Sequence, residues 1–118
     1  MDGIEERARE IGRLLAQTAE YKAVKQANTA LADDREAVTL MNRLAELEDE
    51  ITTALRAGRE PTEQQQQDYE SLAEQLQGLA SYQRVVAAQA NFERLMGRIN
   101  EEIGHGLQAG EQSRIILP

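Results

Sequence analysis

Two side chains near the C-terminus have the types and the spacing of a metal site. Glu102 and His105 form a Glu-x-x-His pair, which places both side chains on one face of a helix. The same spacing supplies half of the ligands in the di-iron carboxylate sites of four-helix bundles. A homodimer would supply a second copy by symmetry, and Glu46 or Glu50 of a facing helix would complete the set. This pattern allows the chemistry of a dimeric, ferritin-like di-iron protein.

Other features of the same residues favour a structural role. His105 is the only histidine of the chain and lies between Gly104 and Gly106, where we expect a helix to end. A histidine in the last turn of a helix is favoured there by the helix dipole. A single motif match without its partner ligands is a weak signal. The sequence therefore favours a protein without a metal or another cofactor.

A second candidate for chemistry is the pair of adjacent carboxylates Asp33 and Asp34. General acid–base catalysis would need one of them buried beside a polar partner, and no apolar pocket is indicated nearby. Asp33 and Glu36 instead have the spacing of a helix-capping box, with an apolar run beginning at Ala37. We therefore interpret the pair as a turn that caps the next helix. With neither a Ser/His/Asp set nor a Gly-rich phosphate loop in the sequence, no catalytic residue is predicted.

Composition and charge exclude several classes of function. The 118 residues include no Cys, which excludes disulfides, thiolate zinc sites and Cys-ligated iron–sulfur clusters. A formal charge of −8 argues against direct nucleic-acid binding, which depends on cationic groups that displace counterions. There is no run of 18 apolar residues and no basic start followed by an apolar stretch. We expect a soluble, cytoplasmic protein that does not bind membranes.

Apolar residues recur every three to four positions along most of the chain, which predicts amphipathic helices. Thr18 either caps the second helix or lies within one longer helix. Gly58 is expected to end the third helix, and Thr62 with Gln65 to cap the fourth. Gly78 marks a bend or a restart, and Gly104 with Gly106 is expected to end the last helix. The predicted helices cover about residues 4–15, 18–31, 34–57, the segment from 62, and 81–103.

These helices predict an all-α fold. Two long stripes, joined by the short link 58–61, should form an antiparallel hairpin on which the N-terminal helices pack. Residues 1–107 would be a single helical domain, followed by a flexible C-terminal tail at 108–118. The third stripe is close to a heptad, coiled-coil pattern, and a hairpin of this size leaves apolar surface on its rim. We therefore predict a dimeric bundle, with a homodimer expected and a hetero-complex with other proteins left open.

The residues of three stretches resemble a known family: 15-LAQTAEYKAVKQANTALADDREAVTLMNRLAELEDEI-51, 58-GREPTEQQ-65 and 89-QANFERLMGRINEEI-103. The chain is similar over about residues 4 to 107 to the YlbF/YmcA family of small all-helical bacterial proteins, and is closest to its YheA-like branch. The positions that carry the resemblance are Tyr21 with Lys22, the Asp33 or Asp34 turn with Ala37, Gly58, and the run Phe92, Leu95, Met96 and Asn100.

The resemblance implies an all-α, commonly dimeric fold without catalytic residues. Better-studied members resemble adaptors in hetero-complexes that influence competence, sporulation and biofilm formation, partly through the endoribonuclease that initiates messenger RNA turnover. Some of those members carry a Cys-bearing tail associated with iron–sulfur clusters, which is not carried over here because the chain has no Cys. The YheA-like branch has no assigned activity to transfer.

Two hypotheses follow, and they belong to different classes. The first is a non-enzymatic helical adaptor and regulator whose Phe92, Leu95 and Met96 pack against a second copy or a partner protein. The same three residues would also suit an ordinary helical core. The second is the dimeric di-iron protein that uses Glu102 and His105. The number of available ligands favours the adaptor.

Overall fold

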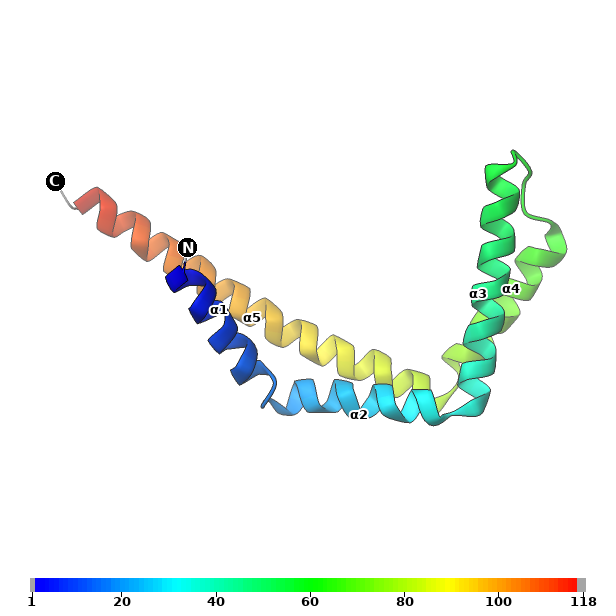
Figure 1. Cartoon of the computed structure of the whole chain (residues 1–118), viewed down its shortest axis with the longest axis horizontal. Coiled ribbons are helices and arrows are strands. Elements are labelled where there is room, and N and C mark those ends of the chain that lie inside the picture. The colour runs from blue at the N-terminus through cyan, green and yellow to red at the C-terminus, as the bar shows by residue number, and fades with distance from the viewer. Residues whose placement is uncertain (1, 117–118) are drawn as a thin grey trace. The chain divides into compact units, whose positions relative to one another are not determined.

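The computed structural model describes the backbone of residues 2–116 and the side chains of residues 3–112. It confirms the predicted all-α class, because the described backbone forms five helices and no strand (Figure 1). No helix within this part of the chain is long and apolar enough to cross a membrane. The helices are α1 (Asp2–Leu15), α2 (Ala19–Asp33), α3 (Arg35–Arg56), α4 (Glu63–Gln77) and α5 (Ala80–Ile116).

The packing divides the chain into two units, which we describe separately. The hairpin unit is Lys25–Ala87, and the terminal unit is Met1–Val24 together with Ala88–Pro118. Helices α2 and α5 contribute residues to both units. The assignment of 1–107 to a single domain, the flexibility of 108–118 and the formation of a dimer all stay predictions.

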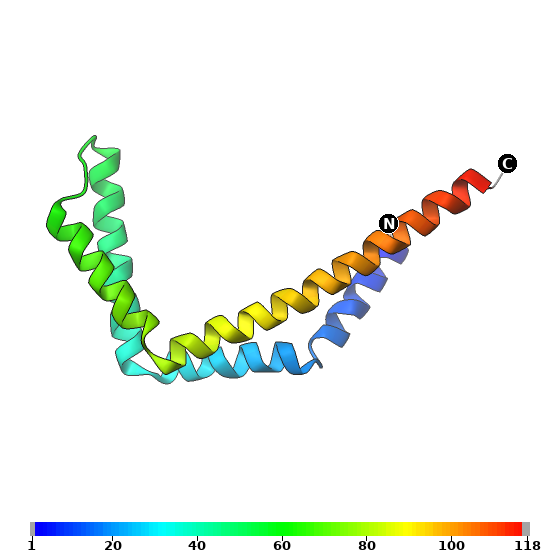
Figure 2. The same cartoon turned by 180° about the vertical axis from the view of Figure 1, so that it is seen from behind.

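The predicted antiparallel hairpin is formed by α3 and α4, which lie side by side in both views of the ribbon (Figures 1 and 2). Gly58 ends α3 in the left-handed conformation, at φ 79°. The amide of Arg59 then donates to the carbonyl of Ala54 at 2.8 Å, which closes the helix end. Thr62 and Gln65 form the predicted capping box at the start of α4, with side chain and backbone bonded in both directions.

The core of the hairpin unit is built from aliphatic side chains at helical spacing. Ala37, Leu40 and Leu76 are buried and in mutual contact. Because these residues come from α3 and α4, the core holds the hairpin together. Partly buried side chains surround this cluster, namely Leu31, Met41, Leu44, Leu72, Leu79 and Tyr82.

The cap of α3 lies one residue later than the spacing predicted. Asp34, and not Asp33, is the N-cap, and its Oδ1 accepts bonds from the amides of Glu36 at 3.1 Å and Ala37 at 3.3 Å. Ser81 explains the difference, because its hydroxyl donates to Oδ2 of Asp34 at 2.6 Å. The carboxylate of Asp34 therefore caps α3 and also ties it to the first turn of α5.

Helix α5 starts where the sequence predicts, but it ends later than predicted. Gly78 caps α4 and the chain restarts as a helix at Ala80, which agrees with the predicted restart. The prediction that Gly104 and Gly106 end the helix is wrong, since α5 continues to Ile116. Gly58 is the one described glycine with a positive φ, so Gly104 and Gly106 do not take the left-handed conformation that commonly ends a helix.

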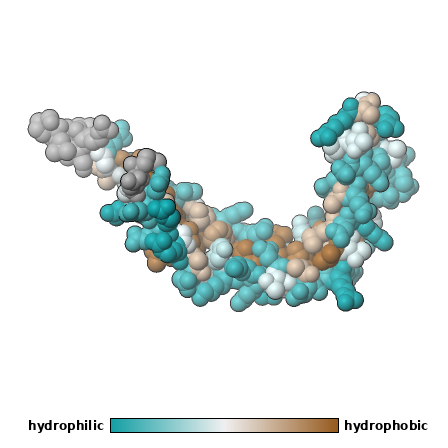
Figure 3. Space-filling view, viewed as in Figure 1, coloured by the Kyte–Doolittle hydropathy of each residue, from teal (hydrophilic) through white to brown (hydrophobic). Residues whose placement is uncertain are grey.

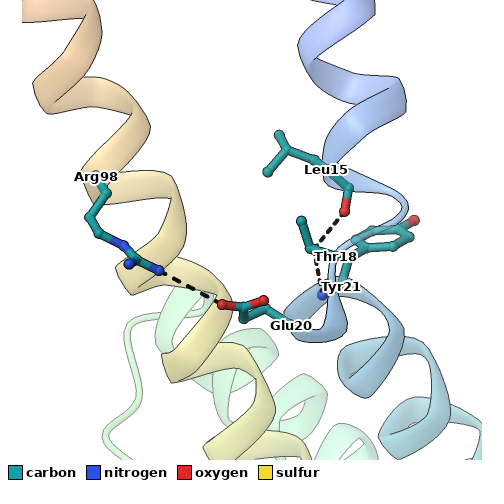
Figure 4. Close-up of polar contacts among 5 residues, drawn as sticks. All are labelled: Leu15, Thr18, Glu20, Tyr21 and Arg98. Atoms are coloured by element: carbon teal, nitrogen blue, oxygen red, sulfur yellow. Dashed lines mark hydrogen bonds and ion pairs between the residues drawn. The ribbon is translucent and has the colours of Figure 1, made fainter.

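The terminal unit contains a hydrogen-bonded turn between α1 and α2 and an aromatic contact between α2 and α5. Thr18 caps α2 by accepting from the amide of Tyr21 at 3.1 Å, while its hydroxyl donates to the carbonyl of Leu15 at 2.6 Å (Figure 4). The ring of Tyr21 packs on the ring of Phe92 with centroids 5.7 Å apart. Ala88 is the one buried hydrophobic residue of this unit among the described side chains.

Candidate protein-interaction groove

An open groove runs between α1 and α5 in the terminal unit, with a volume of about 800 Å³. We call it the α1–α5 groove. Most of its walls are aliphatic, which suits the apolar face of a helix better than a small polar substrate. Its lining residues are Ile11, Leu14, Leu15 and Thr18 from the N-terminal side and Leu95, Arg98, Ile99, Glu101, Glu102 and Ile103 from α5.

The spacing of the aliphatic residues explains why the groove exists. On α5, Leu95, Ile99 and Ile103 recur every four residues, so they form one row along the helix. On α1, Ile11 and Leu15 form a matching row. Two rows on neighbouring helices face a common space, and no third helix of the terminal unit lines it.

Large apolar side chains remain exposed at and beyond the groove. Leu14 is 69% exposed and Ile103 is 51% exposed, although both line it. Both rows also continue past the groove, to Ile4 on α1 at 68% and to Leu107 on α5 at 71%. Figure 3 shows hydrophobic surface among the hydrophilic surface of these helices. Exposed aliphatic residues at helical spacing form a continuous apolar face, which is typical of an interaction surface.

Charged side chains border the apolar face on α5. Arg98 pairs with Glu20 of α2 at 3.8 Å, and the two side chains point toward each other (Figure 4). Arg98 and Glu101 also line a second, more polar groove of about 910 Å³, formed by α2 and α5. These two side chains therefore form the ridge between the polar groove and the α1–α5 groove.

The three predicted interface residues take different positions. Leu95 lines the α1–α5 groove. Phe92 is half-buried against Tyr21, so its ring helps to hold α2 on α5. Met96 is half-buried as well. A role for these residues in an interface with another chain stays a prediction.

Sequence reasoning missed the residues that are most exposed in this region. The sequence predicts Ile103 in a helical stripe but puts Leu107 beyond the end of the last helix, because Gly104 and Gly106 are expected to end it. The signal that could have found them is the four-residue row itself, which runs from Leu95 to Leu107 without a break. Leu14 belongs to the apolar stripe of residues 4–15, and it is 69% exposed because no described segment covers it.

The two residues of the carboxylate–histidine pair lie close together, while the two further predicted ligands belong to the other unit. Oε1 of Glu102 lies 3.5 Å from Nδ1 of His105, and both side chains are exposed. Glu46 and Glu50 belong to the hairpin unit, where they line a different groove with Arg43. Among the residues whose side chains are described, no group of three or more His, Asp or Glu could hold a metal ion.

The remaining candidate, Asp34, has the electrostatics of a structural carboxylate. The hydrogen bond from Ser81 and the bond from the amide of Ala37 lower its pKa below the ordinary value of 3.8. A general acid at neutral pH needs a raised pKa, so this environment shifts Asp34 in the opposite direction. Its bonds are those of a helix cap.

The fold and the groove define a small all-α protein with an apolar face left open between two helices. The chain belongs to the YlbF/YmcA family, since the family model described as "Control of competence regulator ComK, YlbF/YmcA" matches residues 4–108. This confirms the family that the sequence resembles, while the YheA-like branch stays a prediction.

Relatives from several bacteria support this membership. A "UPF0342 protein" of Lactobacillus delbrueckii subsp. bulgaricus is 28% identical over 107 residues, which are 91% of this chain and 92% of that protein. Another from Streptococcus pneumoniae is 35% identical over 78 residues, 66% of this chain and 70% of the relative. A third, from Lactobacillus acidophilus, is 31% identical over 77 residues, 65% of this chain and 66% of the relative.

Proposed function

We propose that this chain is a non-enzymatic helical adaptor that regulates other proteins by binding them through the apolar face of its terminal unit. The observation that carries the proposal is the α1–α5 groove, in which Leu14 and Ile103 remain largely exposed. Burial of aliphatic surface is the main driving force of most protein association. A groove between two helices accepts a helix, so the binding partner presents an amphipathic helix.

The process that the adaptor serves is the finer part of the proposal. The description of the family is one of competence control, which supports a role in the regulation of bacterial competence. Biofilm formation and messenger RNA turnover are the further processes that the family resemblance implies. The carboxylates that could have supported catalysis have other partners here, because Asp34 caps α3.

The adaptor is proposed to form a homodimer when no other partner is bound. A small helical protein with an open apolar face gains stability by pairing with a copy of itself. Every side chain of the groove that a partner would cover belongs to the terminal unit. The hairpin unit is therefore expected to stay outside the contact.

Substitution of one exposed apolar residue in each unit tests the proposal with a matched control. Ile103 is 51% exposed in the terminal unit and Leu55 is 56% exposed in the hairpin unit. Ile103→Lys should raise the dimer dissociation constant by at least about tenfold, because a lysine replaces an apolar contact. Leu55→Lys should leave it unchanged. Light scattering over a dilution series measures both.

The proposed role in competence is tested in the cell. In the source bacterium, deletion of the gene should change transformation frequency, and the Leu55→Lys variant should restore it while Ile103→Lys should not. If Ile103→Lys behaves like the parent in light scattering and in the cell, the face is not the site of action. If Leu55→Lys weakens the dimer and does not restore transformation, while Ile103→Lys behaves like the parent, the site lies in the hairpin unit.

A further inference from the structure

The hairpin unit carries a further open groove, which is separate from the α1–α5 groove. It has a volume of about 510 Å³ and lies against α3, α4 and the link that joins them. We call it the Tyr69 groove. Residues three and four positions apart share one face of a helix, and the lining follows this spacing on α3. The lining residues include Glu48, Ile51 and Thr52 of α3, Pro61 of the link, and Tyr69 and Glu70 of α4.

The Tyr69 groove combines apolar surface with a restrained aromatic ring. Ile51 and Pro61 are half-buried and Tyr69 is 38% exposed, so an incoming side chain can contact all three. The hydroxyl of Tyr69 donates to Oε1 of Glu48 at 3.3 Å. This bond joins α4 to α3 and keeps the side chain of Tyr69 close to a carboxylate. An aromatic ring beside a carboxylate is a favourable site for a cation.

The charged side chains of the groove are all of one sign. Among the described side chains that line it, Glu48 and Glu70 are acidic and none is basic. The nearest basic residues in the sequence, Arg56 and Arg59, are not part of the lining. Neither carboxylate forms an ion pair with another described side chain. Both carboxylates are therefore available to a cation from outside the chain.

The charge of the whole hairpin unit acts in the same direction. Its sequence contains 12 acidic and six basic residues, a net charge of −6. The terminal unit contains nine acidic and seven basic residues, a net charge of −2. The field of the hairpin unit attracts a cationic partner and repels the phosphates of a nucleic acid. The hairpin unit is thus the part of the chain that best suits a basic protein segment.

An arginine side chain matches both properties of the groove. Its aliphatic stem lies on apolar surface while its charged end stays at a polar rim. Its guanidinium stacks on aromatic rings and donates to carboxylates in a fixed geometry. A metal ion fits less well, because no group of three or more His, Asp or Glu among the described side chains could hold one. We propose that the Tyr69 groove binds an arginine-bearing segment of a partner protein, with the stem on Tyr69 and the guanidinium paired with Glu48 and Glu70.

This site goes beyond the proposed function, because it gives the adaptor a second partner at a different unit. The apolar face of the terminal unit recognises an amphipathic helix, whereas the Tyr69 groove recognises positive charge. Two sites of different chemistry allow one chain to hold two different proteins. The proposed homodimer leaves the Tyr69 groove open, because all its lining residues belong to the hairpin unit.

Nuclear magnetic resonance of the full chain tests the proposal with a defined probe. The probe is a short peptide of alternating arginine and alanine with blocked ends. Its addition should shift the backbone amide signals of Ile51, Tyr69 and Glu70 until the change saturates, which gives a dissociation constant. A matched peptide with glutamate in place of arginine should cause no such shift.

Matched double variants separate the groove from the net charge. Glu48→Gln/Glu70→Gln should raise the peptide dissociation constant at least about threefold, because two exposed ion pairs are lost. Glu46→Gln/Glu50→Gln removes the same charge from a different groove of the same unit and should change the constant little at physiological ionic strength. Tyr69→Ala should raise it at least about threefold, through loss of the ring. Circular dichroism checks that each variant keeps the helix content of the parent.

The outcomes of these titrations separate the Tyr69 groove from the apolar face of the terminal unit. Saturating shifts at the groove, weakened by Glu48→Gln/Glu70→Gln and not by the control, support the proposal. Shifts that are absent, that lie outside the groove, or that both double variants weaken equally overturn it. Equal binding of the glutamate peptide overturns it as well. Ile103→Lys should leave peptide binding unchanged, so failure of the homodimer and failure of this site are distinct results.

Discussion

The hairpin unit and the terminal unit are built from the same kind of amphipathic helix, yet they differ in what covers the apolar faces. In the hairpin unit, α3 and α4 cover each other, and Ala37, Leu40 and Leu76 are buried. In the terminal unit, α1 and α5 leave Leu14 and Ile103 exposed. The charges differ too, since the hairpin unit is strongly acidic and the terminal unit is almost neutral.

Under the proposed function, this difference assigns stability to the hairpin unit and recognition to the terminal unit. Aliphatic residues that are buried within the hairpin stabilise the fold of a single chain. Aliphatic residues that remain exposed give their free energy only when another helix covers them. The net charge of −6 on the hairpin unit opposes contact between two such units more strongly than the net charge of −2 on the terminal unit does.

The largest expected effect on stability comes from a deletion in the hairpin core. Leu76 is buried against Ala37 and Leu40, so Leu76→Ala should lower the free energy of unfolding by about 2–5 kcal/mol. Leu107 is 71% exposed in the terminal unit, and Leu107→Ala should change it by no more than about 0.5 kcal/mol. Urea unfolding of dilute protein, followed by circular dichroism, measures both. Equal losses would mean that the two units do not differ in packing.

A second contrast uses one substitution with opposite expected signs. Gly58 has φ 79°, so Gly58→Ala should lower the free energy of unfolding by about 1–2 kcal/mol. Gly104 lies in the interior of α5 with no atom within 4 Å of an added Cβ. Gly104→Ala should therefore raise the helix stability by up to about 1 kcal/mol.

Urea unfolding measures the effect of Gly58→Ala, and hydrogen exchange of α5 amides measures that of Gly104→Ala. A loss of protection in Gly104→Ala would show that Gly104 ends the helix in solution. That result would support the shorter helix, ending near Gly104, that the sequence predicts. A neutral Gly58→Ala would show that the link after α3 does not need the left-handed conformation.

The smallest effect is expected at the cap of α3. The pKa of Asp34 is lowered by Ser81 and by the amide of Ala37, so the unfolded chain binds a proton more readily than the folded one. Its contribution to stability is present above the ordinary pKa of 3.8 and is lost as pH falls through the lower folded value. Asp34→Asn should therefore weaken the acid dependence of the urea midpoint. Asparagine keeps a good cap, so the change at neutral pH should be slight.

Asp33 is the matched control for this titration. Asp33 is exposed and lies next to Asp34 in the sequence, and Asp33→Asn makes the same chemical change as Asp34→Asn. The acid dependence should stay that of the parent. An equal change in both variants would mean that the acid sensitivity reflects net charge rather than the bond from Ser81.

Much of the fold could be predicted from local signals in the sequence. The cap at Thr62 and the stop at Gly58 depend on residues only a few positions apart, and both were predicted. The N-cap at Asp34 was missed by one residue because its selection depends on Ser81, which lies 47 positions away. The continuation of α5 was missed because Gly104 is compatible with both a helix end and a helix interior.

The candidate groove could be predicted only in part. The periodicity identified Ile103 and Leu95 as apolar helical residues, but a period of three to four gives no information on which helix covers them. The exposure of Leu14 depends on where the other helices lie, and the spacing of apolar residues within one helix does not show this. The charge difference between the units, in contrast, was present in the sequence and needed only the boundaries of the units to be recognised.

The most direct test of the central claim, that the hairpin unit is complete by itself while the terminal unit is completed by another helix, is hydrogen exchange at two protein concentrations. Amides of α3 and α4 should show the same protection in both samples. Amides of α1 and of α5 around Ile103 should be better protected in the concentrated sample, because association covers their face. Protection in the terminal unit that does not change with concentration, or a change confined to the hairpin unit, would contradict the claim.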